Sequence, residues 1–560
     1  MLSAFVTIKS LRTRWALEFF SMVLIWVLIG FVIGKNLNAG GFWWTDESRH
    51  AMGGVFILDL IRDMPFGDPM GYALQYFAQY PALALNWYPP FFYGAEALVY
   101  AVLGTSEQSA HLTVLLFLLL GMGGWYLWAR AGWGRSVALL SALLFVLNPQ
   151  FVLWASSVML EAPALAMIIL AVFTFERYLV TPRMRTALLC GVTLALTLLL
   201  KQSTVFILPA LLAYAAFSGR GRLLVRREAV AAYVLVALAL ALLTVHALKF
   251  GIVGLGATLG QLHEDAGAAT SRFSWARWLL YPETLLETWG IPLTVLSVLG
   301  IFATVGSRRR PHDVLIWCWL IAWYLMVTLL FGVKDNAARY MLYAMPPLAL
   351  LACRGLVELS ARRFAHNLAL GGITLLVAWS GWQAWRSPHP YVNGYQEAAR
   401  LVMAQPHSGP ILFAGRFDGN FIFHLRDMDT ARQQVVLRGD KILLSMSVHK
   451  YFGMQSYVQN EDDILKILDK YGVGLVVVEN PDLVGLKEFS LLNDTLTKPQ
   501  FHLLKEHPIA TTLPEASRVK IQIYQYLDQK FPKDGTIVIP LPHMGREIRL
   551  QQGQTLGNIR

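Results

Sequence analysis

The sequence predicts a multi-spanning α-helical membrane protein that ends in a mixed α/β domain outside the membrane. Three observations predict this class. Hydrophobic residues make up 56% of the 560 residues, and charged residues only 15%. The apolar residues gather in runs of helical length, and short arginine-rich loops separate these runs. From residue 386 onward, short apolar stretches alternate with turn signals, which is typical of a globular domain with strands.

The apolar runs predict the transmembrane helices. A span needs roughly 20 mainly apolar residues, so we expect about eleven spans. They lie near 15–34, 111–129, 136–151, 162–180, 186–200, 204–218, 229–249, 285–305, 313–331, 340–355 and 366–385. Several runs are short, so we expect tilted or buried helices among them. The first run has no clear cleavage site after a short apolar core, which favours an uncleaved signal anchor.

The segment 89–104 decides the topology. It is apolar but short, it opens with two prolines, and it carries Glu96. If this segment does not cross the membrane, the loops on the same side as the N-terminus hold about twice as many basic residues as the loops on the other side, as expected for cytoplasmic loops. If it does cross the membrane, the later arginine-rich loops lie on the side opposite to the basic N-terminus. We therefore expect a helix in the outer interface, a cytoplasmic N-terminus and an extracytoplasmic tail.

This topology defines the expected domains. Residues 1–385 form a transmembrane catalytic domain whose first outer loop is 35–110, and residues 386–560 form the soluble domain. The net charge of +11 is explained by basic cytoplasmic loops and requires no nucleic acid. The three cysteines all fall in predicted spans, so the tail folds without disulfides and no metal-type cysteine spacing exists. These are Cys190, Cys318 and Cys353.

The pattern of apolar runs in the tail predicts strands separated by helices and turns. The expected strands are 411–414, 434–437, 475–478, 520–524 and 536–539, and a helix is expected at 461–471. The tail contains no phosphate-loop or dinucleotide fingerprint, and the chain shows no internal repeat.

The sequence Trp-Trp-Thr-Asp-Glu-Ser-Arg-His at 43–50 is the first candidate site. Asp46 and Glu47 follow the first span, which places carboxylates just outside the membrane. One can act as a base while the other holds Arg49 or a divalent cation. A hydrated loop pair is the alternative interpretation, and the position at the membrane surface favours function.

Glu161 and Lys201 are predicted at the outer ends of two spans. Glu161 precedes Pro163, so it can be a second acidic site residue or a first-turn residue that favours the helix dipole. Lys201 ends an apolar run, where a lysine can bind a lipid phosphate or extend to the interface.

Arg339 and Tyr340 precede a proline-containing span, and like Lys201 they can either bind a lipid phosphate or anchor the chain at the interface. Arginine suits bidentate phosphate contact, and an Arg-Tyr pair also suits interface anchoring. Tyr88, which precedes two prolines, fits either an aromatic belt or a lipid groove. His263 lies beside Glu264 and Asp265, which can bind metal or form a solvated loop. The metal candidates are therefore Glu47, Glu161 and His263, and no cofactor is certain.

The order of these residues resembles that in GT-C glycosyltransferases, which use polyprenyl-phosphate sugars. The similar members are bacterial protein O-mannosyltransferases and aminoarabinose transferases, and the resemblance covers about 15–355. It is carried by Thr45 to Arg49, by Tyr88-Pro89-Pro90 with Gly104, by Glu161-Ala162-Pro163, by Lys201 and by Arg339-Tyr340. Two positions depart from the family pattern. Glu161 stands where Asp is usual, and His111 stands where many relatives have Arg.

The resemblance implies an integral-membrane inverting glycosyltransferase of hexosyl or pentosyl type. Asp46 is then the base on the acceptor, Glu161 the second acidic residue, and Lys201 and Arg339 the contacts to the lipid phosphate. The expected partners are a polyprenyl-phosphate sugar, membrane lipids, and a lipid, polysaccharide or protein acceptor at the outer face of a bacterial cell membrane. A transporter or flippase and a non-catalytic envelope scaffold are the alternatives. Transporters tend to place charges at mid-membrane and to show repeats.

Overall fold

The computed structural model divides the chain into two compact units. Unit 1 comprises residues 1–37, 111–245 and 265–389, and unit 2 comprises 38–110, 246–264 and 390–560. The structure describes residues 2–38, 40–84, 87–250, 273–305, 311–330, 334–360, 366–446, 454–530, 536–541, 546–551 and 555–558. The first outer loop thus groups with the tail, whereas the expected domain boundary separates them.

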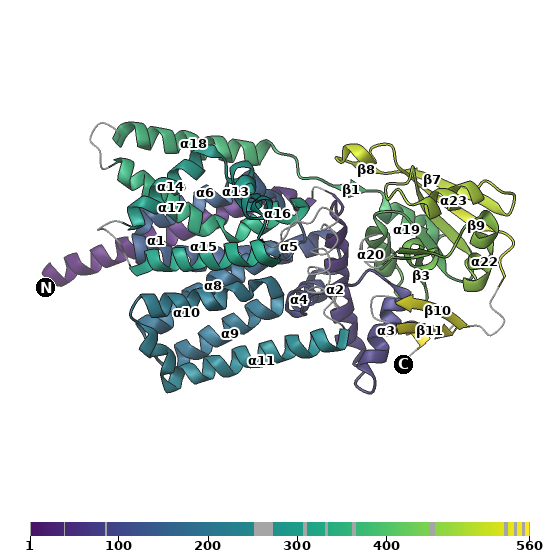
Figure 1. Ribbon diagram of the computed structural model, residues 1–560, viewed down its shortest axis with the longest axis horizontal. Coiled ribbons are helices and arrows are strands. Elements are labelled where there is room, and N and C mark those ends of the chain that lie inside the picture. The colour runs from purple at the N-terminus through teal and green to yellow at the C-terminus, as the bar shows by residue number, and fades with distance from the viewer. Residues whose placement is uncertain are drawn as a thin grey trace. The chain divides into compact units, whose positions relative to one another are not determined.

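Unit 1 is helical (Figure 1). Its helices are α1 (Leu2–Val32), α5 (Glu107–Trp133, whose first turn belongs to unit 2), α6 (Arg135–Val146), α7 (Pro149–Ala155), α8 (Glu161–Val180), α9 (Met184–Leu200), α10 (Ile207–Phe217), α11 (Arg227–Phe250), α13 (Trp275–Trp289), α14 (Ile291–Val305), α15 (Pro311–Leu330), α16 (Lys334–Tyr340), α17 (Met345–Ser360) and α18 (His366–Arg386). Short 3-10 turns lie at η1 (Gly34–Asn38), η2 (Gln202–Phe206), η3 (Gly221–Val225) and η5 (Met341–Tyr343).

Helices occur at every range where a span was predicted. Within the described residues, five are long and apolar enough to cross a membrane, and the number reaches eight if each bent pair is one span. The bent pairs are α6 with α7, α13 with α14, and the segment 337–343 with α17. The expected number of spans therefore remains a prediction, because α9 and the η2–α10 segment are shorter apolar helices.

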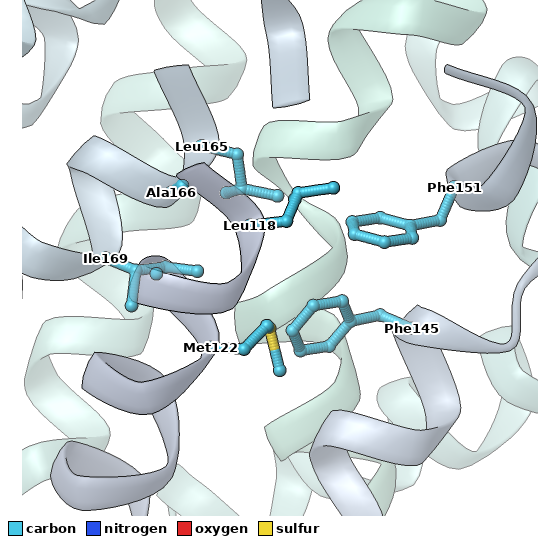
Figure 2. A pocket seen from close by; sticks show the side chains of 8 residues that line it. Leu118, Met122, Phe145, Phe151, Leu165, Ala166 and Ile169 are labelled. Atoms are coloured by element: carbon cyan, nitrogen blue, oxygen red, sulfur yellow. The ribbon is translucent and has the colours of Figure 1, made fainter. Parts of the chain in front are cut away.

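Close helix packing holds unit 1 together. A Cβ atom on Gly300 of α14 would lie 1.9 Å from the carbonyl oxygen of Leu351 in α17, so the two backbones approach as only small residues allow. Between α5, α6, α7 and α8, apolar side chains such as Met122, Phe145 and Phe151 face one another (Figure 2). The space among them does not admit a water molecule, so this seam is packed core rather than a binding cavity.

Unit 2 joins three helices of the predicted first outer loop to the tail. The loop helices are α2 (Thr45–Asp63), α3 (Pro69–Gln79) and α4 (Phe91–Leu103). Helix α4 corresponds to the segment that decides the topology. Its 13 residues give a length of about 20 Å, which is shorter than the hydrocarbon core of a bilayer, and it packs on α2. This geometry suits the expected interfacial helix.

The tail is a mixed α/β domain, as predicted. Its helices are α19 (Tyr395–Met403), α20 (Asp418–Met428), α21 (Gly439–Ile442), α22 (Glu461–Tyr471) and α23 (Lys487–Thr495), with 3-10 turns η7 (Pro514–Ala516) and η9 (Leu556–Asn558). Its strands are β1 (Val392–Asn393), β2 (Ile411–Ala414), β3 (Val436–Arg438), β4 (Leu444–Met446), β5 (Met454–Ser456), β6 (Leu475–Asn480), β7 (Phe501–Pro508), β8 (Ala510–Thr511), β9 (Lys520–Tyr526), β10 (Thr536–Leu541) and β11 (Arg546–Gln551).

The main sheet has five strands in the order β3-β2-β6-β9-β7. Strands β3 and β6 both pair in parallel with β2, while β9 pairs antiparallel with both β6 and β7. Strand β3 lies on one side of β2 and β6 on the other, so the strand order reverses at the carboxyl end of β2. In open α/β sheets such a reversal forms a crevice that commonly binds ligands.

Candidate functional site

The first group of predicted site residues lies in the first turn of α2. The helix begins after the N-cap residue Trp44, which places Asp46 and Glu47 where the helix dipole favours negative charge. Successive helical residues are about 100° apart around the axis, so these two carboxylates have different surroundings.

Glu47 and Asp46 differ in burial and in hydrogen bonding. Glu47 is fully buried, and its Oε1 accepts the backbone N–H groups of Trp43 at 3.1 Å and Trp44 at 3.0 Å. Glu47 is the third residue of the helix, and its side chain caps the helix N-terminus, as an acidic residue at this position commonly does. Asp46 is only half-buried. Asp46 thus has the solvent access that a proton acceptor needs, while Glu47 shapes the helix start.

A histidine that the sequence interpretation missed lies close to this turn. His50 follows Asp46 by four residues, so the two share one face of α2. His50 is buried, its Nδ1 lies 3.0 Å from the Tyr93 hydroxyl, and its ring centroid lies 5.1 Å from that of Tyr88. Burial raises the pKa of Tyr93, and the neighbouring Tyr88, Glu96 and Asp46 raise it further. The spacing of four residues was the available sequence signal.

Arg49 faces the tail. Its Nη2 donates to both carboxylate oxygens of Asp418, at 2.9 and 3.2 Å, and its Nη1 donates to the carbonyl oxygen of Thr45. The predicted substrate contacts of Arg49 and of Tyr88 stay predictions.

The second group of predicted residues meets at the start of α8. Glu161 is the first residue of α8, Lys201 is the C-cap residue directly after α9, and Arg339 lies in the last turn of α16. The Lys201 Nζ lies 2.7 Å from Glu161 Oε1, and the Arg339 Nε lies 3.3 Å from the same oxygen. All three side chains are buried, with Glu161 fully so. The fold therefore brings together three residues that were selected individually from the sequence.

Two cations of this cluster contact the same carboxylate oxygen in a buried place. The Tyr340 ring lies beside both cations, with its centroid 5.3 Å from Lys201 Nζ and 5.6 Å from Arg339 Cζ. Neighbouring ammonium and guanidinium groups are suited to contact the oxygens of a phosphate. The interpretation of Lys201 and Arg339 as separate interface anchors does not account for their shared burial.

His111, which departs from the family pattern, pairs with another histidine. Its ring centroid lies 6.2 Å from that of His389, and both side chains are buried. Burial, together with the neighbouring His111 and Lys35, lowers the pKa of His389 to about 3. His389 is therefore neutral at physiological pH.

Metal-binding geometry is not apparent in the described part of the chain. Within it, no group of three or more His, Cys, Asp or Glu side chains lies as metal ligands do. Of the three metal candidates, Glu47 caps α2 and Glu161 pairs with Lys201 and Arg339. The third, His263, lies outside the described residues.

Known proteins support the fold and the resemblance. The profile of the family described as dolichyl-phosphate-mannose-protein mannosyltransferase matches residues 88–247. No curated protein matches the sequence. The structure of ArnT from Cupriavidus metallidurans bound to undecaprenyl phosphate is similar with a TM-score of 0.60 and 14% identity, over 90% of this chain and 97% of ArnT.

Two further structures share the fold. The arabinofuranosyltransferase AftD from Mycobacteria is similar with a TM-score of 0.53 and 14% identity, over 93% of this chain and 40% of AftD. The oligosaccharyltransferase AglB from Archaeoglobus fulgidus, in complex with an inhibitory peptide and a dolichol-phosphate, has a TM-score of 0.50 and 14% identity, over 83% of this chain and 70% of AglB. The chain therefore has the GT-C fold of these membrane glycosyltransferases, as its sequence predicted.

Proposed function

We propose that this protein is an inverting glycosyltransferase that moves a sugar from a polyprenyl-phosphate donor to an acceptor at the outer face of the cell membrane. The observation that carries the proposal is the buried cluster of Lys201, Arg339 and Glu161, because an ammonium and a guanidinium group that lie this close together suit a phosphate group. The similar ArnT structure holds undecaprenyl phosphate, and the AglB structure holds a dolichol-phosphate. These ligands support a lipid phosphate for this chain as well.

The proposed reaction is a single displacement. An acceptor oxygen or nitrogen attacks the anomeric carbon of the sugar, while the bond between that carbon and the phosphate oxygen breaks. The bonding electrons leave with the lipid phosphate, whose charge Lys201 and Arg339 stabilise. Asp46 takes the proton that the acceptor loses. Attack opposite to the leaving group inverts the anomeric centre.

The remaining predicted residues have supporting roles in this proposal. Glu161 holds the two cations in place between turnovers, and Glu47 fixes the helix start that carries Asp46. His50, Tyr88 and Tyr93 form the aromatic surroundings of that turn. The sugar and the class of acceptor are not specified by these residues.

Mass spectrometry of co-purified lipids tests the proposal. Wild-type protein, Asp46→Asn, Arg339→Gln and the control Arg220→Gln are purified in detergent. Arg220 pairs with Glu176 near the opposite end of α8, so its loss removes a comparable ion pair away from the cluster. We expect a polyprenyl monophosphate sugar that is enriched in Asp46→Asn, depleted in Arg339→Gln and unchanged in Arg220→Gln. Absence of polyprenyl phosphate from all four well-folded proteins would favour a transporter or scaffold instead.

A further inference from the structure

We infer that Asp418 of the tail is a positioning residue for the first turn of α2. In this inference, which rests on the proposed function, the tail domain uses the segment that follows β2 and the end of β3 to hold the helix that carries Asp46. All the contacts that carry the inference lie within unit 2.

The loop before Asp418 is rigidly held at the strand ends. Glu479, near the end of β6, is buried and accepts the backbone N–H groups of Arg416 and Phe417, each at 2.8 Å. It also accepts the Tyr395 hydroxyl at 2.7 Å. A Cβ atom on Gly415 would lie 2.4 Å from the Glu479 carboxyl carbon, so this loop packs directly on the carboxyl group. Asp418, the first residue of α20, is therefore placed by buried contacts.

The Asp418 carboxylate pairs with two guanidinium groups. Arg49 donates to both of its oxygens, and the Nε of Arg438 lies 2.7 Å from Oδ2. Arg438 also donates to Asp440 through two bonds, at 3.0 and 2.9 Å, and to the carbonyl oxygen of Pro81 at 3.2 Å. Arg438 thus orients the Asp418 carboxylate, and Arg49 is the partner supplied by α2.

Close contacts also bring the first turn of α2 against α20. A Cβ atom on Gly419 would lie 2.3 Å from the Ser48 hydroxyl oxygen, so a larger residue at this position would displace the Ser48 side chain. The side-chain amide of buried Asn420 donates to the carbonyl oxygen of Phe42 at 2.8 Å. Asp418, Gly419 and Asn420 thus contact the chain on both sides of Asp46.

The charges fix the register of this contact. Along α2, basic Arg49 meets acidic Asp418, whereas acidic Asp59 and Asp63 meet basic Arg426 and Arg432. Reversing or sliding α2 along the tail would bring like charges together, which opposes wrong arrangements. Of these three ion pairs, the one made by Asp418 lies nearest to Asp46 along α2.

Kinetics and hydrogen exchange of four variants test the inference in the full-length protein. Asp418→Asn, Arg49→Met and their double variant probe the contact. Arg432→Gln is the matched control, because it removes another ion pair between the same two segments, with Asp63 at the far end of α2. We expect Asp418→Asn to lower kcat at least tenfold without changing donor KM, and to speed amide exchange at 43–50. Asp418→Glu should restore part of kcat.

The double variant distinguishes positioning from general destabilisation. If Asp418 acts through Arg49, the double variant loses no more kcat than the worse single variant. Arg432→Gln should change kcat less than twofold. Additive losses of kcat, or unchanged exchange at 43–50 in Asp418→Asn, would overturn the inference. If the wild type transfers no sugar, the proposed function fails, and the exchange measurement still decides whether Asp418 holds this turn.

Discussion

The first turn of α2 and the cluster at the start of α8 balance their charges in opposite ways. In α2, backbone amides satisfy Glu47 and Asp418 pairs with Arg49, so Asp46 presents a carboxylate with access to solvent. At α8, one carboxylate serves two buried cations. The two regions therefore suit different chemistry. The first suits proton transfer and the second suits an anion, and four predictions test this division.

The largest expected effect is on turnover at Asp46. In Asp46→Asn, the side chain keeps its size but cannot accept the acceptor proton. We expect kcat to fall by about 10²- to 10⁴-fold, the usual contribution of a general base. Donor binding and the melting temperature should stay near those of the wild type. Glu47→Gln is the neighbouring control, and its kcat should change much less. Turnover of Asp46→Asn within a few-fold of wild type would remove Asp46 from this role.

The second prediction concerns the two cations beside Glu161. Replacing Arg339 by Gln removes one of these two cations. We expect donor KM to rise by about tenfold or more, since a charge-assisted bond contributes about 1.5–3 kcal/mol. Arg220→Gln at the other end of α8 should leave donor KM unchanged. Equal effects of the two variants on KM would show that the cluster has no special affinity for phosphate.

The third prediction concerns the pH dependence of the tail that supports α2. Burial raises the pKa of Glu479 to about 7. Between the pKa of the unfolded chain and this value, the folded state binds more protons, so stability falls as the pH rises through that window. Protonation of Glu479 thus contributes about 3 kcal/mol to the free energy of unfolding at low pH, and this contribution is lost above pH 7. Thermal unfolding at pH 5 and pH 7.5 should show this loss in wild type and a smaller one in Glu479→Gln. Equal pH dependence in both proteins would contradict the assignment.

The smallest expected effect concerns the helix start. In Glu47→Ala, the backbone N–H groups of Trp43 and Trp44 lose their acceptor. We expect the free energy of unfolding to fall by about 1 kcal/mol, as for the loss of other helix caps. Chemical denaturation measures this loss, and Glu47→Gln, which keeps an acceptor oxygen, should lose less. An equal loss in both variants would show that the charge of Glu47 matters more than its hydrogen bonds.

Local sequence patterns predicted much of the fold. The strand at 411–414 and the helix at 461–471 occur as predicted, because apolar runs and turn signals act over a few residues. The edge strand β7 was missed, since its exposed charged residues break the alternation of a half-buried strand. The spans 136–151, 285–305 and 340–355 were predicted as helices, but the bend inside each of them was not, because packing with neighbouring helices decides such bends.

The sequence by itself determined the class of protein, the GT-C resemblance and the residues that carry it, because hydrophobicity and spacing are local properties. Only the tertiary structure decided which of these residues meet. Glu161 and Lys201 are 40 positions apart, and Arg49 and Asp418 are 369 apart, yet each pair forms a short ion pair. Charged side chains choose partners by distance and burial after the backbone has packed, so no local pattern contains that choice.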